Sequence, residues 1–277
     1  PDARSRFLEE IATSSVFDRL READSEGFDA FLEERIHCVT GEVTEAGFGI
    51  GQEDYRKLAT ELDAVINSAA SVNFREELDK ALAINTLCLR NIAGLADLNP
   101  QLAVLQVSTC YVNGMNSGQV TESVIKPAGE AVPRSPDGFY EIEELVRLLQ
   151  DKIEDVQARY SGKVLEKKLV DLGIREANRY GWSDTYTFTK WLGEQEVLKH
   201  FPQAVILRPS VIFGPEDKFF NRFAGMTRFG PVLPVVGGDT KFQPVYAGDV
   251  AEAAVRALDD ECGAGATHEL GGPKVYG

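Results

Sequence analysis

The feature that most constrains the fold is an alternation of short apolar runs with longer helical patterns. Apolar runs occupy residues 64–69, 103–108 and 204–208, and segments with a helical spacing of apolar residues lie between them. This alternation is typical of a parallel sheet covered by helices, because parallel strands need a long crossover connection. We therefore predict an α/β fold with a Rossmann-like doubly wound parallel sheet, formed by a single domain over residues 1–277.

Further elements follow from the same patterns. The sequence predicts a short strand over Arg35–Gly41, a helix over Glu53–Leu62 and a long helix over Phe74–Asp97. Pro244–Asp249 leads into another helix that ends near Leu258.

The interval between the last two apolar runs is unusually long. Asn113–Gly138 contains prolines and glycines and is predicted to be a loop at the substrate-side rim. Tyr140–His200 is almost entirely helix-forming. We interpret residues 140–180 as a helical insertion on the substrate side of the domain, with a purely structural appendage as the alternative.

A phosphate-binding loop is not found where it would be expected. A dinucleotide-binding domain begins with a strand that leads into a glycine-rich turn at a helix N-terminus. Gly47–Gly51 has the spacing G-x-G-x-G, and no apolar strand runs straight into it, so we interpret it as the turn before the next helix. The expected sheet therefore lacks its first strand, phosphate loop and second strand.

The strongest chemical signal is a Y-x-x-x-K pattern formed by Tyr186 and Lys190 on a predicted helix. A spacing of four residues places both side chains on one face of the helix. An ammonium beside a phenol favours the phenolate, so we expect Lys190 to lower the pKa of Tyr186 towards the range of an acid/base catalyst. The pattern alone is common in helices and becomes specific only through its context.

That context is a hydroxyl at the carboxyl end of a buried strand, where ligands bind in sheets of this type. Ser108 and Thr109 both follow the run at 103–108, and Gly114 closes the segment. Together with Tyr186 and Lys190, this arrangement resembles the active site of the short-chain dehydrogenase superfamily. Counting back five residues from Gly114 assigns the hydroxyl of the proton-handling trio to Thr109.

Other segments match the superfamily in the correct order, and the resemblance implies their roles. It implies that Asn85 holds a water of the proton relay and that Glu42 contacts the adenine of the cofactor. The full set of implied cofactor-binding residues is Glu42, Asn67, Ser68, Ala69, Asn85, Ser108, Pro209 and Ser210. The implied cofactor is NADPH.

Within the superfamily, residues 1 to about 200 resemble bacterial alcohol-forming fatty acyl-CoA reductases. The matching stretches are Ser14–Leu20, Ile66–Phe74, Val107–Gly114 and Tyr186–Lys190. The resemblance implies a fatty acyl-CoA substrate and an insertion that shapes a channel for the acyl chain or its carrier.

The remainder resembles a different branch of the superfamily. Pro209–Phe223 and Phe242–Val250 are similar to the dehydrogenase-like accessory subunit of respiratory complex I. That resemblance implies tight NADPH binding without catalysis. The chain is therefore interpreted as a mosaic of two branches joined near Phe201.

Composition limits the class of partner. A net charge of −15 argues against nucleic-acid binding, because phosphate contacts need clustered basic residues. No apolar run approaches the roughly 18 residues of a membrane span, although peripheral membrane contact is left open. The four cysteines and three histidines lack metal-ligand spacing, so we expect no metal site and reduced, cytoplasmic thiols. The cysteines are Cys38, Cys88, Cys110 and Cys262.

Three functions remain at this point. The first is NADPH-dependent reduction of a fatty acyl-CoA to the aldehyde or alcohol, with Tyr186 as proton donor. The second is a non-catalytic NADPH-binding or assembly subunit. The third is an inactive fragment, because the backbone donors of a phosphate loop are missing.

Overall fold

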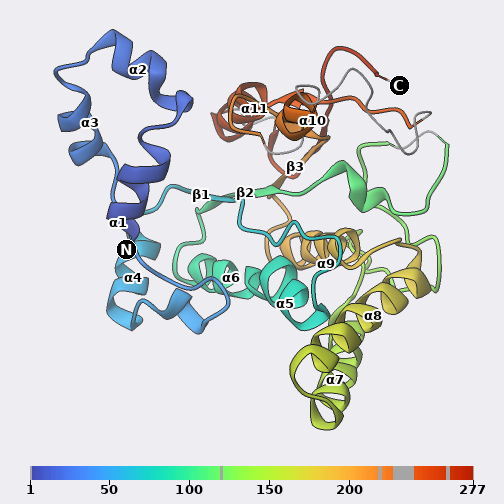
Figure 1. Cartoon of the computed structure of the whole chain (residues 1–277). Helices are drawn as coiled ribbons and strands as arrows, with labels where there is room; N and C mark the ends of the chain where they lie inside the picture. Colours follow the sequence, from blue (N-terminus) through green and yellow to red (C-terminus); the bar gives the residue numbers. More distant parts are fainter. Residues whose placement is uncertain (1, 119–120, 218–219, 227–239, 260–262, 277) are drawn as a thin grey trace.

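The computed structural model describes residues 2–118, 121–217, 220–226, 240–259 and 263–276 (Figure 1). Its main sheet contains β1 (Ala64–Asn67), β2 (Ala103–Val107), β3 (Val205–Pro209) and β6 (Thr267–Leu270). The strands lie in the order β1-β2-β3-β6 and are all parallel. This arrangement confirms the predicted parallel α/β fold, and the three predicted strands of this sheet lie within a residue or two of their expected positions.

A second, smaller sheet was not predicted. It pairs β4 (Ile212–Phe213) with β5 (Val245–Tyr246) in parallel. Strands of two residues are too short to show a periodic pattern, so the sequence carried no signal for them. The helix predicted after Asp249 is present as α11 (Ala247–Asp259), which begins directly after β5.

The two faces of the main sheet carry different helices (Figure 1). One face is covered by α5 (Leu78–Leu82), α6 (Leu89–Leu98) and α9 (Thr185–His200). The other is covered by α10 (Phe220–Met226) and α11. Successive side chains of β2 pack on opposite faces of the sheet. Val104 packs in the cluster that contains residues of α6, and Leu105 packs with Ala254 of α11.

Helix α9 is the centre of the fold. Every residue from Thr185 to Val197 is buried, which is typical of a helix surrounded by protein on all sides. Gly193 allows the close approach of its neighbour, since a Cβ there would lie 2.2 Å from the carbonyl oxygen of Asn85. The predicted helix-rich region therefore places its last helix in the core.

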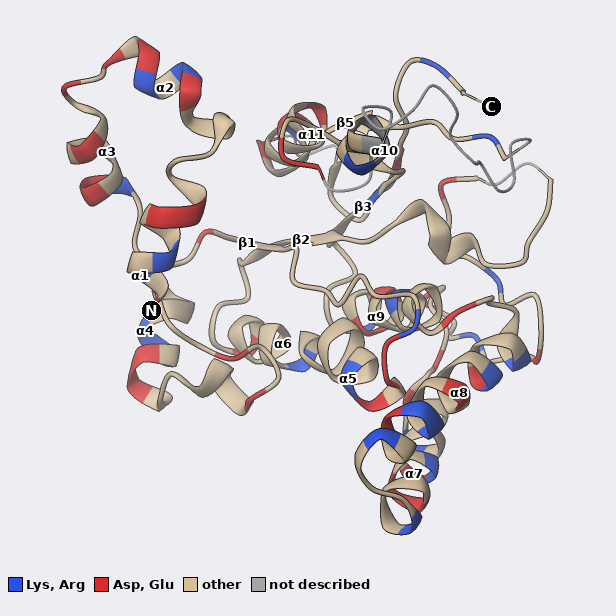
Figure 2. Cartoon of the chain, viewed as in Figure 1, with Lys and Arg blue, Asp and Glu red and all other residues tan. Residues whose placement is uncertain are grey.

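The predicted insertion forms a helical hairpin beside this core. It consists of α7 (Glu143–Arg159) and α8 (Gly162–Tyr180), joined by a short turn. Acidic and basic residues are mixed along its outer surface (Figure 2). The buried Glu176 carboxylate of α8 accepts a hydrogen bond of 2.7 Å from Lys152 of α7, which fastens the two helices together.

The long helix predicted over 74–97 begins later and is interrupted. It starts at Leu78, and residues Ala83–Leu87 form a π-helical turn (η4) between α5 and α6. Among the described residues, the run Leu78–Leu98 has the length and apolar composition of a membrane span, which the sequence analysis did not anticipate. Half of its most apolar 18-residue stretch is buried within the fold, and Leu82 and Leu89 are among the buried residues.

The N-terminal region forms short helices at one side of the molecule (Figure 1). They are α1 (Ala3–Arg6), η1 (Phe7–Ile11), η2 (Ser15–Phe17), α2 (Asp18–Ala23) and α3 (Phe28–Arg35). The strand predicted over Arg35–Gly41 is wrong. The Ile36 backbone is extended, but its carbonyl accepts a hydrogen bond from the Arg4 side chain and belongs to no β-ladder in the described chain.

The turn predicted at Gly47–Gly51 is present. It contains η3 (Ala46–Gly49) and leads into α4 (Gln52–Glu61), in agreement with the predicted helix. Gly47, Gly49 and Gly51 all have positive φ, which favours glycine at these positions. The segment is thus a glycine-rich turn before a helix, as expected. Cys38, Cys88 and Cys110 are free thiols, and Cys262 lies outside the described residues.

Candidate active site

Helix α9 places Tyr186 and Lys190 on one side, next to the carboxyl end of β2. The helix begins after Asp184, whose carboxylate accepts a hydrogen bond of 2.8 Å from the backbone N–H of Thr187. Tyr186 and Lys190 are 8% and 3% exposed, so both are held within the protein. The four-residue spacing therefore places Tyr186 and Lys190 on the same side of buried helix α9, next to β2.

Thr109 completes the trio from the other side. It follows β2 and is buried, and its hydroxyl lies close enough to the phenol of Tyr186 to act on that phenol's pKa. The segment after it is held by Trp182, whose indole N–H donates a hydrogen bond of 2.8 Å to the Val112 carbonyl. The structure therefore brings together Thr109, rather than Ser108, with the phenol.

The electrostatics of Tyr186 differ from the expectation. Burial raises the pKa of the phenol above its ordinary value, and the hydrogen bond from Thr109 acts in the opposite direction. Lys190 is not among the main causes of this shift. The predicted lowering of the Tyr186 pKa by Lys190 is therefore not seen, because desolvation dominates at this position. A neutral phenol is the form that can donate a proton.

Lys190 is held by the strand beneath it. Its ammonium donates a hydrogen bond of 2.8 Å to the backbone carbonyl of Val107, the last residue of β2. Burial lowers the pKa of Lys190 to about 8, while the charges of Glu194 and Cys88 act to raise it. The lysine thus links α9 to β2 directly below Ser108 and Thr109.

A buried ion cluster lies one turn further along α9 and was not predicted. Arg208 of β3 donates two hydrogen bonds, of 2.9 and 2.7 Å, to the Glu194 carboxylate, and both side chains are 1% exposed. Arg208 also contacts Glu269 of β6 at 3.2 Å. Glu194 lies four residues after Lys190, so helical spacing was the available signal. The cluster fixes α9 on β3 and β6.

Asn85 has a structural role beyond the predicted one. Its side-chain carbonyl accepts a hydrogen bond of 2.9 Å from the backbone N–H of Ser71, and its amide donates one of 3.0 Å to Thr189. Asn85 lies in the π-helical turn and is 2% exposed. It therefore joins the loop after β1 to the helix position beside Lys190. The water-holding role assigned to Asn85 stays a prediction.

Two exposed aromatic rings adjoin Tyr186 and were missed by the sequence analysis. The Phe74 ring packs edge to face on Tyr186 with a centroid distance of 5.1 Å. Tyr111 packs on Phe74 in the same manner at 6.2 Å. Phe74 is 48% exposed and Tyr111 is 37% exposed. Phe74 lies in a loop and Tyr111 in the short 3-10 turn Cys110–Asn113, and segments this short give no periodic signal.

The predicted cofactor-binding residues occupy different surroundings. Ser108, Pro209 and Ser210 follow or end the central strands β2 and β3, and Ser210 lies near the thiol of Cys110, the residue after Thr109. The Ser108 hydroxyl is buried and has no hydrogen-bond partner among the described residues. These three residues therefore share the strand ends with the trio.

The remaining predicted residues lie at or beyond β1. Asn67 ends β1, donates a hydrogen bond of 2.8 Å to Gln106 of β2 and accepts one of 3.2 Å from the Ala69 N–H. Ser68 stands between Asn67 and Ala69 in the same turn. Glu42 lies on an exposed turn, where its carboxylate accepts hydrogen bonds from Thr44. No described contact joins Glu42 to the trio, and its contact with adenine stays a prediction.

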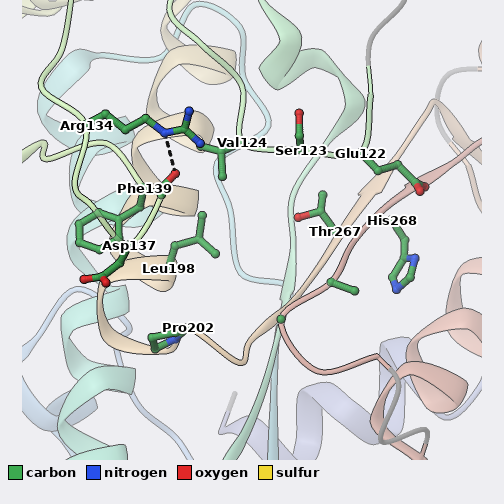
Figure 3. Close-up of a pocket in the computed structure, with 13 residues that line it drawn as sticks. Glu122, Ser123, Val124, Arg134, Asp137, Phe139, Leu198, Pro202, Thr267 and His268 are labelled. Carbon is green, nitrogen blue, oxygen red and sulfur yellow. Dashed lines mark hydrogen bonds between the residues drawn. The ribbon is translucent and has the colours of Figure 1, made fainter.

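A separate cavity of about 530 Å³ opens beside the edge strand β6 (Figure 3). Its wall includes Leu198 and Pro202, which precede β3, together with Thr267 at the start of β6. Arg134 and Asp137 line the opposite side, and the Arg134 side chain donates a hydrogen bond to the Gly138 carbonyl. None of the trio lines this cavity, which lies by the beginnings of the strands.

A parallel sheet with this threonine, tyrosine and lysine at its strand ends defines a Rossmann-like domain of the short-chain dehydrogenase type. Comparison with known families narrows the class. Residues 1–236 match the family described as male sterility protein, an NAD-binding family. The chain therefore belongs to the male sterility protein family.

Several similar proteins are fatty acyl-CoA reductases. The chain is 31% identical over 241 residues to fatty acyl-CoA reductase 2, chloroplastic, of Arabidopsis thaliana, covering 85% of this chain and 39% of that protein. It is 29% identical over 253 residues to the alcohol-forming fatty acyl-CoA reductase of Simmondsia chinensis, covering 89% of this chain and 50% of that protein. The chain thus spans half or less of the length of these relatives.

The second resemblance is also confirmed. Over 89 residues, the chain is 46% identical to the mitochondrial NADH dehydrogenase [ubiquinone] 1 alpha subcomplex subunit 9 of Arabidopsis thaliana. That match covers 31% of this chain and 22% of that protein.

Solved structures share the fold at low sequence identity. The terminal R domain from the myxalamid PKS-NRPS pathway matches with a TM-score of 0.60 and 19% identity, over 88% of this chain and 52% of that one. A dTDP-glucose 4,6-dehydratase from Bacillus anthracis, in complex with NAD, matches with a TM-score of 0.55 and 16% identity, over 90% and 63% of the two chains.

Proposed function

We propose that this chain carries the proton-handling site of an NADPH-dependent reductase that acts on fatty acyl-CoA thioesters. The observation that supports it most is the placement of the buried Thr109 hydroxyl beside the Tyr186 phenol at the end of β2, with Lys190 one helical turn after Tyr186. The similarity to fatty acyl-CoA reductases supplies the substrate class.

In the proposed reaction, NADPH supplies a hydride to the thioester carbonyl carbon. The neutral phenol of Tyr186 donates a proton to the carbonyl oxygen, and Thr109 hydrogen-bonds to the same oxygen as negative charge develops. Breakdown of the resulting hemithioacetal would return its hydroxyl proton to the Tyr186 phenolate as the carbon–sulfur bond breaks, so that an aldehyde forms and coenzyme A leaves as a thiolate, which takes a proton from solvent. A second molecule of NADPH would supply the hydride, and the Tyr186 phenol the proton, that convert the aldehyde into the alcohol. The phenolate would then regain its proton from solvent. Lys190 holds α9 against β2 and would contact the ribose of the cofactor.

The residues at the strand ends fit a dinucleotide. The Ser108 hydroxyl is buried without a partner, which normally costs free energy unless a ligand supplies one. Pro209 and Ser210 lie beside it at the end of β3. Structural neighbours that contain NAD and NADP share this fold, which supports a nicotinamide cofactor.

We further propose that the sheet continues beyond β1 in the active protein. Within the described chain, β1 pairs only with β2, and Ile66 of β1 is 50% exposed. An open, apolar strand edge is normally paired or covered. A strand, a glycine-rich phosphate turn and a second strand would fill it. Without them the chain alone should bind NADPH weakly and be inactive. The channel-forming role of residues 140–180 and the cytoplasmic location also stay predictions.

The second candidate is a non-catalytic NADPH-binding subunit, favoured by the 46% identity to the mitochondrial NADH dehydrogenase subunit. The proton-handling trio argues for the reductase, because a binding module has no need of a buried proton donor.

The test is NADPH titration by fluorescence on this chain and on one extended at its N-terminus through a strand, glycine-rich turn, helix and strand. If the extended chain binds NADPH and oxidises it with palmitoyl-CoA, the reductase proposal is supported. Tyr186→Phe should then lower kcat/KM by roughly 10²- to 10⁴-fold without weakening NADPH binding. Tight NADPH binding without turnover would instead favour the binding-subunit candidate.

A further inference from the structure

The surface beside the Tyr186 phenol is apolar and aromatic. Phe74 contacts Tyr186 directly, and Tyr111 contacts Phe74. Large rings that remain about half exposed next to a buried polar trio leave apolar area uncovered at the candidate site. Along the chain, the neighbouring Val72 and Met115 are 69% and 50% exposed.

The position of Phe74 is fixed by its loop. Asn85 holds Ser71 at the base of the loop. The Ser71 N–H donates a hydrogen bond of 2.9 Å to the Asn85 side-chain carbonyl, and the Asn85 amide donates one of 3.2 Å to the Ser71 carbonyl. The Ser71 hydroxyl also donates a hydrogen bond of 2.6 Å to Glu76 on the far side of Phe74. A turn closes between them, with the Glu76 N–H donating to the Asn73 carbonyl at 3.1 Å. Phe74 is therefore presented at the tip of an anchored turn.

Tyr111 is fixed equally well. Its backbone N–H donates to the Thr109 hydroxyl at 3.3 Å, so the ring starts two residues from the trio. The Gly114 N–H donates to the Tyr111 carbonyl at 3.1 Å. The two rings thus form a preorganised wall, which lowers the entropy cost of binding an apolar group against it.

We infer that Phe74 and Tyr111 form the wall that receives the alkyl chain of the substrate next to the reacting carbonyl, and that they select for long apolar chains. The inference rests on the proposed function for the identity of the substrate, an acyl thioester with an unbranched hydrocarbon chain. The occupant follows from the surface itself. An exposed phenylalanine against the proton donor, extended by a second exposed ring, suits a hydrocarbon, whereas a polar sugar would leave hydroxyl groups unpaired.

The test measures binding calorimetrically for acetyl-, octanoyl- and palmitoyl-CoA and for dodecanol, using the full chain. We expect the binding affinity to rise with alkyl length. Phe74→Ala should weaken the binding of palmitoyl-CoA and of dodecanol about tenfold and leave the binding of acetyl-CoA unchanged. Phe74→Leu should recover most of the loss. Phe31→Ala is the matched control, because Phe31 is a similarly exposed phenylalanine, at 36%, on α3.

Two results would overturn the inference. One is a binding affinity that is independent of alkyl length, and the other is an equal loss of affinity for palmitoyl-CoA in Phe74→Ala and Phe31→Ala. The thermal midpoint of each variant establishes that it is folded. Failure of the proposed function has a different signature. Length-dependent binding that requires Phe74, combined with no NADPH oxidation by the N-terminally extended chain, would remove the reductase proposal and leave the alkyl-binding wall in place.

Discussion

The two faces of the main sheet are packed very differently. The face that carries α5, α6 and α9 contains two large clusters of buried residues, which include both tryptophans, Trp182 and Trp191. Among the described residues, the opposite face has one small cluster, formed by Leu105, Val205 and Leu207 with Ala254 of α11. Tyr186 and Lys190 come from the densely packed face. The difference teaches that the two α9 residues of the candidate site are positioned from one side of the sheet.

Matched leucine truncations give the largest expected effect. Leu192→Ala on α9, where the side chain is 0% exposed, should cost about 4 kcal/mol of unfolding free energy. Leu207→Ala on the opposite face, at 1% exposure, should cost about 2 kcal/mol, because a small cluster can relax into the space. Urea denaturation of both variants measures the contrast. Equal losses would mean that the two faces contribute equally.

The pH dependence of stability should reveal the buried Lys190. Its pKa is about 8 in the fold and higher when unfolded, so the desolvation cost is fully present below pH 8. As the pH rises above 8, the folded protein loses this proton before the unfolded chain does. Stability relative to Lys190→Met should therefore increase between pH 8 and 10, by up to about 3 kcal/mol. Denaturation curves at several pH values would show this, and parallel curves for both proteins would contradict it.

The contact between α9 and η4 should tolerate little added volume. Gly193→Ala would place a Cβ against the Asn85 carbonyl and force the helices apart, at a cost of about 1–3 kcal/mol. Gly225→Ala on α10 is a suitable control, since a Cβ there meets nothing within 4 Å. A Gly193→Ala protein with unchanged thermal stability would show that this face is not close-packed.

The smallest effect should arise where the N-terminal helices meet the lightly packed side. The Ser15 backbone N–H donates a hydrogen bond of 2.9 Å to the Glu216 carboxylate, and this bond lowers the Glu216 pKa. Glu216→Ala should speed hydrogen exchange at the Ser15 amide while leaving amides of α9 unchanged. Exchange that accelerates across α9 would show that the two regions unfold together.

Sequence patterns predicted the elements with a clear apolar run or helical spacing better than the rest. The helix over Gln52–Glu61, strands β1, β2 and β3, and helix α11 follow directly from such patterns. The π-helical turn could not be predicted, because it depends on Asn85 bonding to Ser71 and Thr189, which are distant in sequence. The strand expected at Arg35–Gly41 had an apolar pattern, but pairing requires a neighbour that no local pattern specifies.

The candidate site was predictable in its residue types and not in its electrostatics. The spacing of Tyr186 and Lys190 and the position of Thr109 could be derived from motifs. The raised pKa of Tyr186 depends on burial, which the motif does not encode. Glu194 and Arg208 were missed because a buried ion pair between a helix and a strand requires knowledge of the tertiary fold.

The Asn85 side chain gives the site a mechanical property. One amide group is bonded both to the base of the Phe74 turn and to Thr189, the residue before Lys190. A force on the exposed ring is therefore transmitted through two hydrogen bonds to the helix that holds the ammonium. Acyl chains of different length would press on Phe74 to different extents and so displace α9, which carries Tyr186, by different amounts. The length of the acyl chain would then influence turnover as well as affinity.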